Sequence, residues 1–480
     1  MEKREIQAII LAAGKSSRFN TGSTKLSFTL CGQEMIAYPA KVLAQMNIPM
    51  TFVVGFQKQA IKQIINNHAI PNTSFIEQEK QLGTGHALLC SQSDWHAEHI
   101  LVLNGDVPLI TQEIIEELIT THREQNATIS FVATLSSDTS AAGLGRVIRD
   151  GKHIESIEAR HCTDEQLANP LNAGIYLFNR SFLEKTLHAI PANEKSGEIY
   201  ITDLIKHASD RGLTVATMVA PFDYVRGVNT LKELWAAEHI KRSELLTHWM
   251  NKGVRFAAAL NVCIDLDVEI GAGTFIGTGA VITKGTRIGS NCIINAFSFI
   301  SNTIIHDEVD IKPHSAICDS IIHKGSQVGP FAHLNNSIIQ DSVIIGNFVE
   351  VKRSTVGAHS KAKHLSYIGD ACLGEKVNIG AGAITCNYNG VSKHETVIHD
   401  GAFIGGNCVL VAPITIGKRA MTAAGSTITN DVPENAVAFG RSRQENKEGY
   451  AQELRERWTQ QELQPSPIIS THKVKQVQDH

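Results

Sequence analysis

The apolar residues in the first half of this chain occur in short runs separated by stretches of helical periodicity. The runs predict strands, and one stretch between them, Gln112–His122, predicts a helix. The expected strands are Ala8–Leu11, Thr51–Val54, Ile100–Leu103, Thr128–Thr134 and Ala173–Phe178. Strands that alternate with helices indicate a mostly parallel sheet covered by helices, whose ligands bind beyond the carboxyl ends of the strands.

The second half of the chain has a different period. Isoleucine stands at every sixth position, and a small or medium side chain follows each of the first six isoleucines by four residues. The isoleucines are Ile264, Ile270, Ile276, Ile282, Ile288, Ile294 and Ile300, and the phase returns at Ile404, Leu410, Ile416, Thr422 and Ile428. A period of six predicts a hexapeptide β-helix, in which three hexads form one triangular coil and the isoleucines stack inside it.

These patterns divide the 480 residues into four parts. They are expected to form, in order, an α/β domain, a linker helix, a β-helix, and a C-terminal arm with a disordered tail, over residues 1–229, 230–253, 254–440 and 441–480. The linker helix is expected from Thr230 to about Met250, and the arm is helix-like through Trp458. The stretch Cys386–His399 breaks the hexads and is expected to loop out of the coil.

Composition narrows the class of protein. A net charge of −4 and a pI of about 6.6 argue against nucleic-acid binding through bulk electrostatics. The charged N-terminus precedes an apolar run too short for a signal peptide or a membrane span. Nine cysteines, scattered from Cys31 to Cys408 without a C-x-x-C pair, favour reduced thiols over disulfides or a zinc site. We therefore expect a cytoplasmic protein with no membrane span and no nucleic-acid partner.

The first apolar run ends in a glycine turn rich in cations, QAIILAAGKSSRF. Gly-Lys-Ser is the ending of a Walker A loop, but Ile9 stands where that loop requires its first glycine, so a P-loop is unfavoured. The backbone N–H groups at Gly14, with Lys15, Arg18 and Lys25 nearby, could still bind phosphates. The alternative is an ordinary strand-to-loop turn with exposed basic residues.

Two further segments carry candidate chemistry. Gly83-Thr84-Gly85 could be a helix-start turn, or it could recognise a base or sugar together with Gln78, whose amide both donates and accepts. The strand of ILVLNGDVPLI brings Asp106 to its carboxyl end, where one carboxylate suits Mg²⁺, which keeps several water and phosphate ligands. The alternative is that Asp106 caps the loop or the following helix.

The order of these motifs resembles one family. LAAGKSSRF with Lys25, QLGTGHA, NGDVPL, AGLGRV, LNAGIY and RGVN are followed by a hexapeptide β-helix. Over about residues 5–450 the chain resembles the bifunctional N-acetylglucosamine-1-phosphate uridylyltransferase/glucosamine-1-phosphate N-acetyltransferases, the GlmU family. The resemblance implies a Rossmann-like mixed-sheet α/β nucleotidyltransferase domain and a left-handed β-helix. It also implies a transferase that makes UDP-N-acetylglucosamine, a cell-wall precursor.

The resemblance implies a uridylyl site that binds UTP, N-acetylglucosamine 1-phosphate and Mg²⁺. The residues of the UTP site would be Leu11, Ala12, Ala13, Gly14, Arg18, Lys25, Gln78, Gly83, Thr84, Asn104 and Gly105. Asp106 and Asn229 would bind Mg²⁺, and Gly145, Glu158 and Asn172 would hold the sugar ring. In-line attack of a sugar phosphate on UTP needs positioning and charge neutralisation, with no covalent protein nucleophile. Ser16-Ser17 and Asn104 depart from the family's usual Gly-Thr and Tyr.

The resemblance also implies an acetyl site with acetyl-CoA as co-substrate. His364 would be the general base for the attacking amine. The acceptor sugar phosphate would contact His333, Lys352, Tyr367, Asn378 and Lys393, the last from the looped segment. Acetyl-CoA would contact Ala381, Asn387, Tyr388, Gly406, Ala424 and Arg441. Sites of this kind form between the coils of a trimer, so a homotrimer is expected.

One departure bears on the acetyl activity. His333-Leu334-Asn335-Asn336 stands where the family typically has Arg-x-Arg-Pro. Histidine lacks the bidentate fork of arginine, and loss of one charged hydrogen bond of roughly 1.5–3 kcal/mol weakens binding about 10- to 150-fold. Gly406 replaces a family serine. The alternatives are a sugar-1-phosphate nucleotidyltransferase whose β-helix is a trimerisation or regulatory module, and a non-catalytic subunit.

Overall fold

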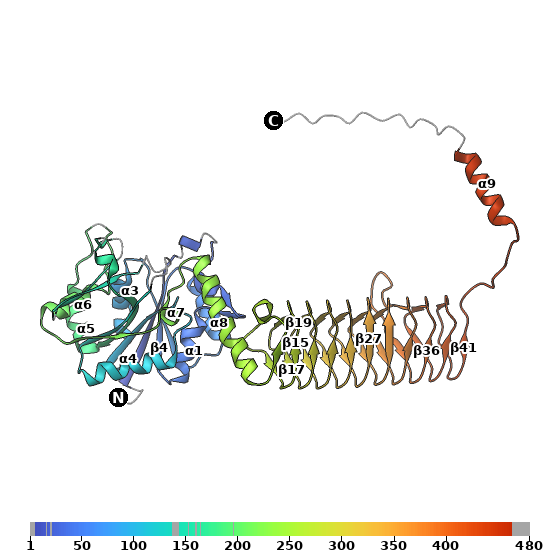
Figure 1. Ribbon diagram of the computed structural model, residues 1–480, viewed down its shortest axis with the longest axis horizontal. Helices are drawn as coiled ribbons and strands as arrows, with labels where there is room; N and C mark the ends of the chain where they lie inside the picture. Colours follow the sequence, from blue (N-terminus) through green and yellow to red (C-terminus); the bar gives the residue numbers. More distant parts are fainter. Residues whose placement is uncertain are drawn as a thin grey trace.

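The computed structural model describes residues 5–15, 17–19, 22–136, 144–151, 153–158, 161–163, 165–194 and 196–462. Ser16 and the tail after residue 462 lie outside these residues. Figure 1 shows a globular N-terminal domain, the helix α8 and a long β-helix in succession, with a separate terminal helix α9.

The N-terminal domain is built on a mixed sheet in the order β11-β7-β10-β6-β1-β4-β5. These strands are β1 Ile6–Ala12, β4 Met50–Val54, β5 Thr73–Glu77, β6 His99–Asn104, β7 Ile129–Thr134, β10 Leu171–Asn179 and β11 Val215–Val219. All five expected strands are confirmed. Strand β1 pairs in parallel with β4 and β6, whereas β10 runs antiparallel to β6 and β7.

Helices cover both faces of this sheet because its strands are apolar on both sides. In β1, Ile6, Ala8 and Ile10 face one core cluster and Ile9 faces the other. The helices are α1 Ala37–Gln45, α2 Lys58–Asn67, α3 Thr84–Cys90, α4 Gln112–Glu124, α5 Arg180–Thr186, α6 Asp203–Asp210 and α7 Phe222–Val225. Smaller pieces are the 3-10 turn η3 Lys25–Ser27, the hairpin β2 Thr29–Leu30 and β3 Gln33–Glu34, and the pair β8 Arg146–Asp150 and β9 His153–Ile157.

The expected linker helix is α8, Leu231–Asn251, and it packs against both domains. It begins at Thr230, whose hydroxyl accepts a hydrogen bond from the Glu233 backbone N–H at 3.2 Å, a capping arrangement. Ala237 belongs to a core cluster of the N-terminal domain, whereas Leu246 and Trp249 belong to the core of the β-helix. The helix therefore anchors one domain to the other.

Three parallel sheets form the β-helix, from β12 Arg255–Phe256 to β41 Val437–Ala438. All seven spaced isoleucines are buried, and so are the five later rungs of the same phase. Between these two sets the period shortens: Ile282 pairs with Ile300, but Ile300 pairs with Ile317. The difference lies at one corner of the coil. In the earlier coil two residues with positive φ, Lys284 and Gly285, make this corner, whereas in the next coil Asn302 alone makes it, so the turn is one residue shorter.

The interruption in the repeat is shorter than expected. Strands β34 Ile384–Cys386 and β35 Thr396–Ile398 remain within the coil, so residues 387–395 alone leave it. The arm carries α9, Tyr450–Glu462, which stands apart from the β-helix in Figure 1. Among the described residues, no helix has the length and hydropathy needed to cross a membrane.

Candidate functional site

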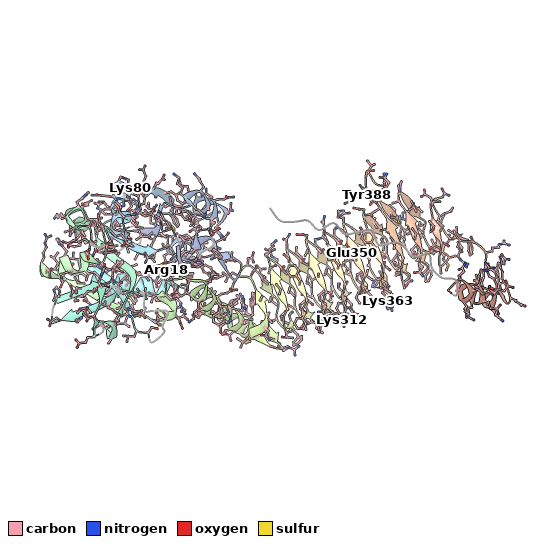
Figure 2. The ribbon with its side chains drawn as sticks, turned by 90° about the horizontal axis from the view of Figure 1, so that it is seen from above. Arg18, Lys80, Lys312, Glu350, Lys363 and Tyr388 are labelled. Carbon is pink, nitrogen blue, oxygen red and sulfur yellow. The ribbon has the colours of Figure 1, made fainter. Side chains whose placement is uncertain are left out.

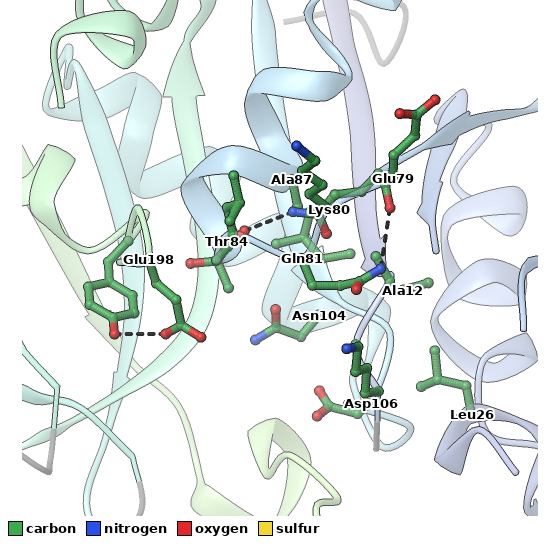
Figure 3. Close-up of a pocket in the computed structure, with 18 of the residues that line it drawn as sticks. Ala12, Leu26, Glu79, Lys80, Gln81, Thr84, Ala87, Asn104, Asp106 and Glu198 are labelled. Carbon is green, nitrogen blue, oxygen red and sulfur yellow. Dashed lines mark hydrogen bonds between the residues drawn. The ribbon is translucent and has the colours of Figure 1, made fainter. Parts of the chain in front are cut away.

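A cavity of about 810 Å³ opens at the carboxyl ends of β1, β5 and β6 (Figure 3). Ten of the residues expected at the uridylyl site line it: Leu11, Ala12, Ala13, Gly14, Lys25, Gln78, Gly83, Thr84, Asn104 and Asp106. Gln81, Leu82 and Ala87, from the QLGTGHA motif, line it as well. Other lining residues carried no motif signal, namely Leu26, Glu79, Lys80, Glu198 and Tyr200. Glu79 and Lys80 lie between Gln78 and that motif, which could have marked them.

The charged centre of this cavity joins three distant segments. The ammonium of Lys25 pairs with the Asp106 carboxylate and lies 2.8 Å from Asn229 Oδ1. Arg18 donates to the same Asn229 oxygen at 2.8 Å. The backbone explains the approach, because the Val228 N–H donates to the Asp106 carbonyl at 2.9 Å. The hydroxyl of Thr111 caps α4, which leaves the Asp106 side chain to face the cations.

Gln78 is held in place by the start of α3. Its side chain is buried, and Nε2 donates to the Gly83 carbonyl at 3.2 Å and lies 3.0 Å from His86 Nδ1. Gly83 has a φ of +100°, and an added Cβ would lie 2.5 Å from the Ile199 carbonyl oxygen, so a side chain does not fit there. The motif therefore begins a helix, as the first alternative expected, and it also lines the cavity; recognition of a base or sugar stays a prediction.

Three polar side chains, Asn104, Glu198 and Tyr200, form part of the cavity wall. Asn104 lies over Gly174, where an added Cβ would be 2.6 Å from Asn104 Nδ2. Opposite, the Tyr200 hydroxyl donates to Glu198 at 2.7 Å. Gly105 lies behind the wall, with its N–H bonded to the Leu11 carbonyl at 2.9 Å.

The three residues expected to hold the sugar ring form a neighbouring group that does not line the cavity. The Asn172 N–H donates to the Gly145 carbonyl at 2.9 Å, and Asn172 Nδ2 donates to Ser156 Oγ at 2.8 Å. Glu158 accepts from the Thr202 hydroxyl at 3.4 Å. The amide of Asn172 is thus already engaged by the protein, which sequence motifs could not reveal.

A second candidate site lies on the β-helix, well away from the first. Figure 2 shows Arg18 and Lys80 in the N-terminal domain and Glu350 and Tyr388 along the β-helix. On adjacent strands β25 His333–Asn335, β28 Glu350–Lys352 and β31 Tyr367–Gly369, the residues His333, Glu350 and Tyr367 stand in register. His333 Nδ1 lies 3.5 Å from a Glu350 oxygen. Lys352 follows the buried Val351 in β28, so its side chain points away from the core on the same sheet.

His364 ends the strand β30, Lys361–His364, and is exposed. Its Nδ1 lies 2.7 Å from Oδ1 of Asn347, at the end of the adjacent strand β27 Ile344–Asn347. An amide oxygen only accepts hydrogen bonds, so Nδ1 donates and Nε2 presents its lone pair outward. Asn378, in β33 Asn378–Ile379, pairs in register with Lys361 at the other end of β30.

The start of the looped segment is fixed by an ion pair that carried no motif signal. The guanidinium of Arg353 donates to both Asp370 oxygens, at 2.6 and 2.7 Å, and Asn387 Nδ2 donates to the same carboxylate. These donors lower the pKa of Asp370, the hydrogen bond from Arg353 most of all. Asn387 Nδ2 also lies 3.4 Å from the Tyr367 hydroxyl, which joins two of the expected residues.

The residues expected to contact acetyl-CoA follow one corner of the β-helix over successive coils. The N–H of Asn407, next to Gly406, donates to the Ala381 carbonyl at 2.7 Å. The N–H of Gly425, next to Ala424, donates to the Gly406 carbonyl at 2.8 Å. Arg441 is exposed just beyond. In the loop, Tyr388 pairs with Lys393 and both side chains are exposed. In the single chain, most of these residues are therefore open to solvent.

Comparisons with known proteins agree with this two-part arrangement. A MobA-like NTP transferase domain matches residues 8–198, a GMPPB C-terminal domain matches residues 260–342, and six bacterial transferase hexapeptide repeats match residues 395–430. These matches confirm the expected fold class, a nucleotidyltransferase domain followed by a left-handed hexapeptide β-helix.

Relatives cover nearly the whole chain. The bifunctional protein GlmU of Exiguobacterium sp. is 40% identical over 450 residues, which cover 92% of this chain and 98% of that protein. The protein of the same name from Fervidobacterium nodosum is 39% identical over 94% of this chain and 98% of its own length. The one from Clostridium botulinum strain Loch Maree is 37% identical, over 92% and 97%. The chain is a bifunctional transferase and belongs to the GlmU family.

Proposed function

We propose that the chain acetylates glucosamine 1-phosphate with acetyl-CoA and transfers uridylyl from UTP to N-acetylglucosamine 1-phosphate, forming UDP-N-acetylglucosamine. We assign uridylyl transfer to residues 1–229 and acetyl transfer to residues 254–440. The observation that carries the proposal is the convergence of Lys25, Asp106 and Asn229, of which Lys25 and Asp106 line the cavity at the carboxyl ends of the strands.

In uridylyl transfer the protein positions the triphosphate of UTP and the phosphate of the sugar, and it neutralises their negative charge. The backbone at Gly14 and the ammonium of Lys25 lie on the cavity wall, where they can bind the triphosphate. The fixed amide of Gln78 is suited to the uracil edge, since it has both donors and an acceptor. A phosphate oxygen of the sugar phosphate attacks the α-phosphorus as the bond to pyrophosphate breaks, and Lys25 stabilises the negative charge.

The oxygens of Asp106 and Asn229 fit a magnesium ion. Both already contact one cation, the Lys25 ammonium, so they share a point at which a positive charge is stable. One or two protein oxygens are what Mg²⁺ takes when phosphates and water supply its other ligands. The ion would neutralise phosphate charge, and Asp106 and Asn229 would hold it.

In acetyl transfer His364 accepts the proton of the attacking amine. Nε2 of its neutral ring carries the lone pair, because Nδ1 donates to Asn347. The amine nitrogen forms a bond to the thioester carbonyl carbon, the proton passes to Nε2, and the carbon–sulfur bond breaks to release CoA. Lys352 and Tyr367 project from the adjacent sheet, where they can bind the acceptor.

His333 sets the strength of acceptor binding. Its imidazole faces Glu350, whose carboxylate opposes the binding of a phosphate. We therefore expect weaker binding of glucosamine 1-phosphate than an arginine at this position would give.

We further propose that the chain assembles as a homotrimer and acts in the cytoplasm. The hexapeptide-repeat domain supports oligomerisation. Ala381 and Ala424 are exposed, and the exposed Tyr388 and Val391 belong to the segment that leaves the coil, where a neighbouring coil could meet them. All nine cysteines are free, as expected in a reducing compartment.

The test measures both products separately. Pyrophosphate release from UTP and N-acetylglucosamine 1-phosphate should require Asp106: Asp106→Asn should abolish it, and Asp150→Asn, at an exposed strand end, should not. CoA release with glucosamine 1-phosphate should be lost in His364→Ala and retained in His399→Ala, an exposed histidine elsewhere on the coil. Pyrophosphate release without CoA release would leave a nucleotidyltransferase on a structural β-helix.

A further inference from the structure

The turn of the β2–β3 hairpin in the N-terminal domain touches the first coil of the β-helix. The Leu266 N–H donates to the Cys31 carbonyl at 3.0 Å. At the next residue, Gly32, an added Cβ would lie 2.6 and 2.7 Å from the Asp265 carboxylate oxygens, so that carboxylate lies directly over the turn. The side chain of Leu266 packs against the cores of both domains.

The coil side of this contact is rigid. Asp265 is tied to its own coil through its N–H, which donates to the Ile282 carbonyl at 3.0 Å, and through a carboxylate oxygen that accepts from the Lys284 N–H at 3.2 Å. Both hairpin residues at the turn have positive φ, 43° at Cys31 and 79° at Gly32, and Cys31 is buried. These contacts and backbone conformations hold the turn in one position against the coil.

The base of the same hairpin holds the segment that carries Lys25. The Met35 N–H donates to the Phe28 carbonyl at 2.9 Å, and the Ile36 N–H donates to the Leu26 carbonyl at 3.3 Å. Leu26, next to Lys25, is buried in the wall of the cavity. A short hydrogen-bonded hairpin thus connects the turn to the segment whose ammonium pairs with Asp106.

We propose that the first coil of the β-helix, at Asp265 and Leu266, positions a group of the uridylyl site: through its contact with the turn at Cys31 and Gly32 it sets the place of Lys25 in the cavity. The inference rests on the proposed function of that cavity. It means that the β-helix supports the nucleotidyl site of its own chain as well as carrying the acetyl site.

Gly32→Ala tests the contact directly. The new methyl group overlaps the Asp265 carboxylate, so the turn must move away from the coil by about an ångström, and misplacement of a catalytic group by about 1 Å can cost roughly 100-fold. We expect the kcat of pyrophosphate release to fall by about 10- to 100-fold. CoA release by the same preparation should be unchanged, which shows that the β-helix is intact.

Two further variants separate positioning from simple strain. Gly212→Ala is the matched control, because Gly212 has a φ of +67° and nothing lies within 4 Å of an added Cβ. It should keep wild-type kcat. Asp265→Ala removes the overlapping carboxylate, so the double variant Gly32→Ala/Asp265→Ala should recover most of the lost kcat.

The outcomes are distinct. A wild-type kcat in Gly32→Ala, or a loss that Asp265→Ala fails to recover, overturns the positioning role while wild-type turnover keeps the proposed function. A wild-type protein that releases no pyrophosphate overturns the proposed uridylyl function, and the inference falls with it. Equal losses in Gly32→Ala and Gly212→Ala would also overturn the inference, because they would reduce the effect to backbone strain.

Discussion

Asn347 is expected to keep His364 in the tautomer that acetyl transfer requires. The two side chains lie 2.7 Å apart, between His364 Nδ1 and Asn347 Oδ1. In Asn347→Ala the acceptor is gone, so the proton can reside on either ring nitrogen and the ring can rotate. Only the tautomer with a free Nε2 lone pair can accept the proton of the attacking amine.

The size of the effect follows from one hydrogen bond at a solvent-exposed site. A neutral bond contributes roughly 0.5–1.5 kcal/mol, or a factor of about 2 to 13 in the ratio of the competent ring form to the others. We expect Asn347→Ala to lower the kcat of CoA release by at most that factor and to leave the KM for acetyl-CoA unchanged. His364→Ala removes the base itself and should cost roughly 100-fold or more.

Asn347→Asp is the variant that separates tautomer control from packing. The carboxylate keeps an acceptor at the same place, so kcat should recover at high pH. Its negative charge also stabilises the protonated ring, so the acid limb of the pH–rate profile should move to higher pH. The assay is CoA release over a range of pH for the three proteins. Equal kcat in wild type and Asn347→Ala, or an equal loss at high pH in both variants, would refute the reasoning.

Two predictions concern stability. Burial lowers the pKa of His122 from 6.5 to about 4, so the unfolded chain takes up a proton first, and stability should be lost as the pH falls from 6.5 towards 4. The free energy of unfolding should fall by at most about 3 kcal/mol, since each pKa unit corresponds to about 1.36 kcal/mol. Urea unfolding of wild type and His122→Gln over this pH range measures the loss. If the stability of both proteins changed with pH in the same way, the prediction would be contradicted. Ile317 is fully buried in a β-helix coil, so Ile317→Ala should lower the free energy of unfolding by about 2–5 kcal/mol. Ile304 is exposed, so Ile304→Ala should change it little in the same assay.

The local order of the fold could be predicted from the sequence. Seven isoleucines at a spacing of six indicated the coil, and the apolar run after Gln7 indicated a strand buried on both faces, because burial repeats with the geometry of the backbone. The motif at Gly83 was also readable, since glycine is required where φ is positive and a backbone carbonyl lies close by.

Which side chains meet was decided by the tertiary structure. Lys25 and Asn229 are 204 residues apart in the chain, yet they share a hydrogen bond, and Glu198 and Tyr200 reach the cavity from a loop without a motif. The partners of His333 and His364 come from neighbouring coils, where a shift of one residue at a corner would separate them. Periodicity specifies which side of a strand is buried, because that depends on local backbone geometry. The pairing of distant polar groups depends on how loops close and how domains dock, and local sequence does not encode this.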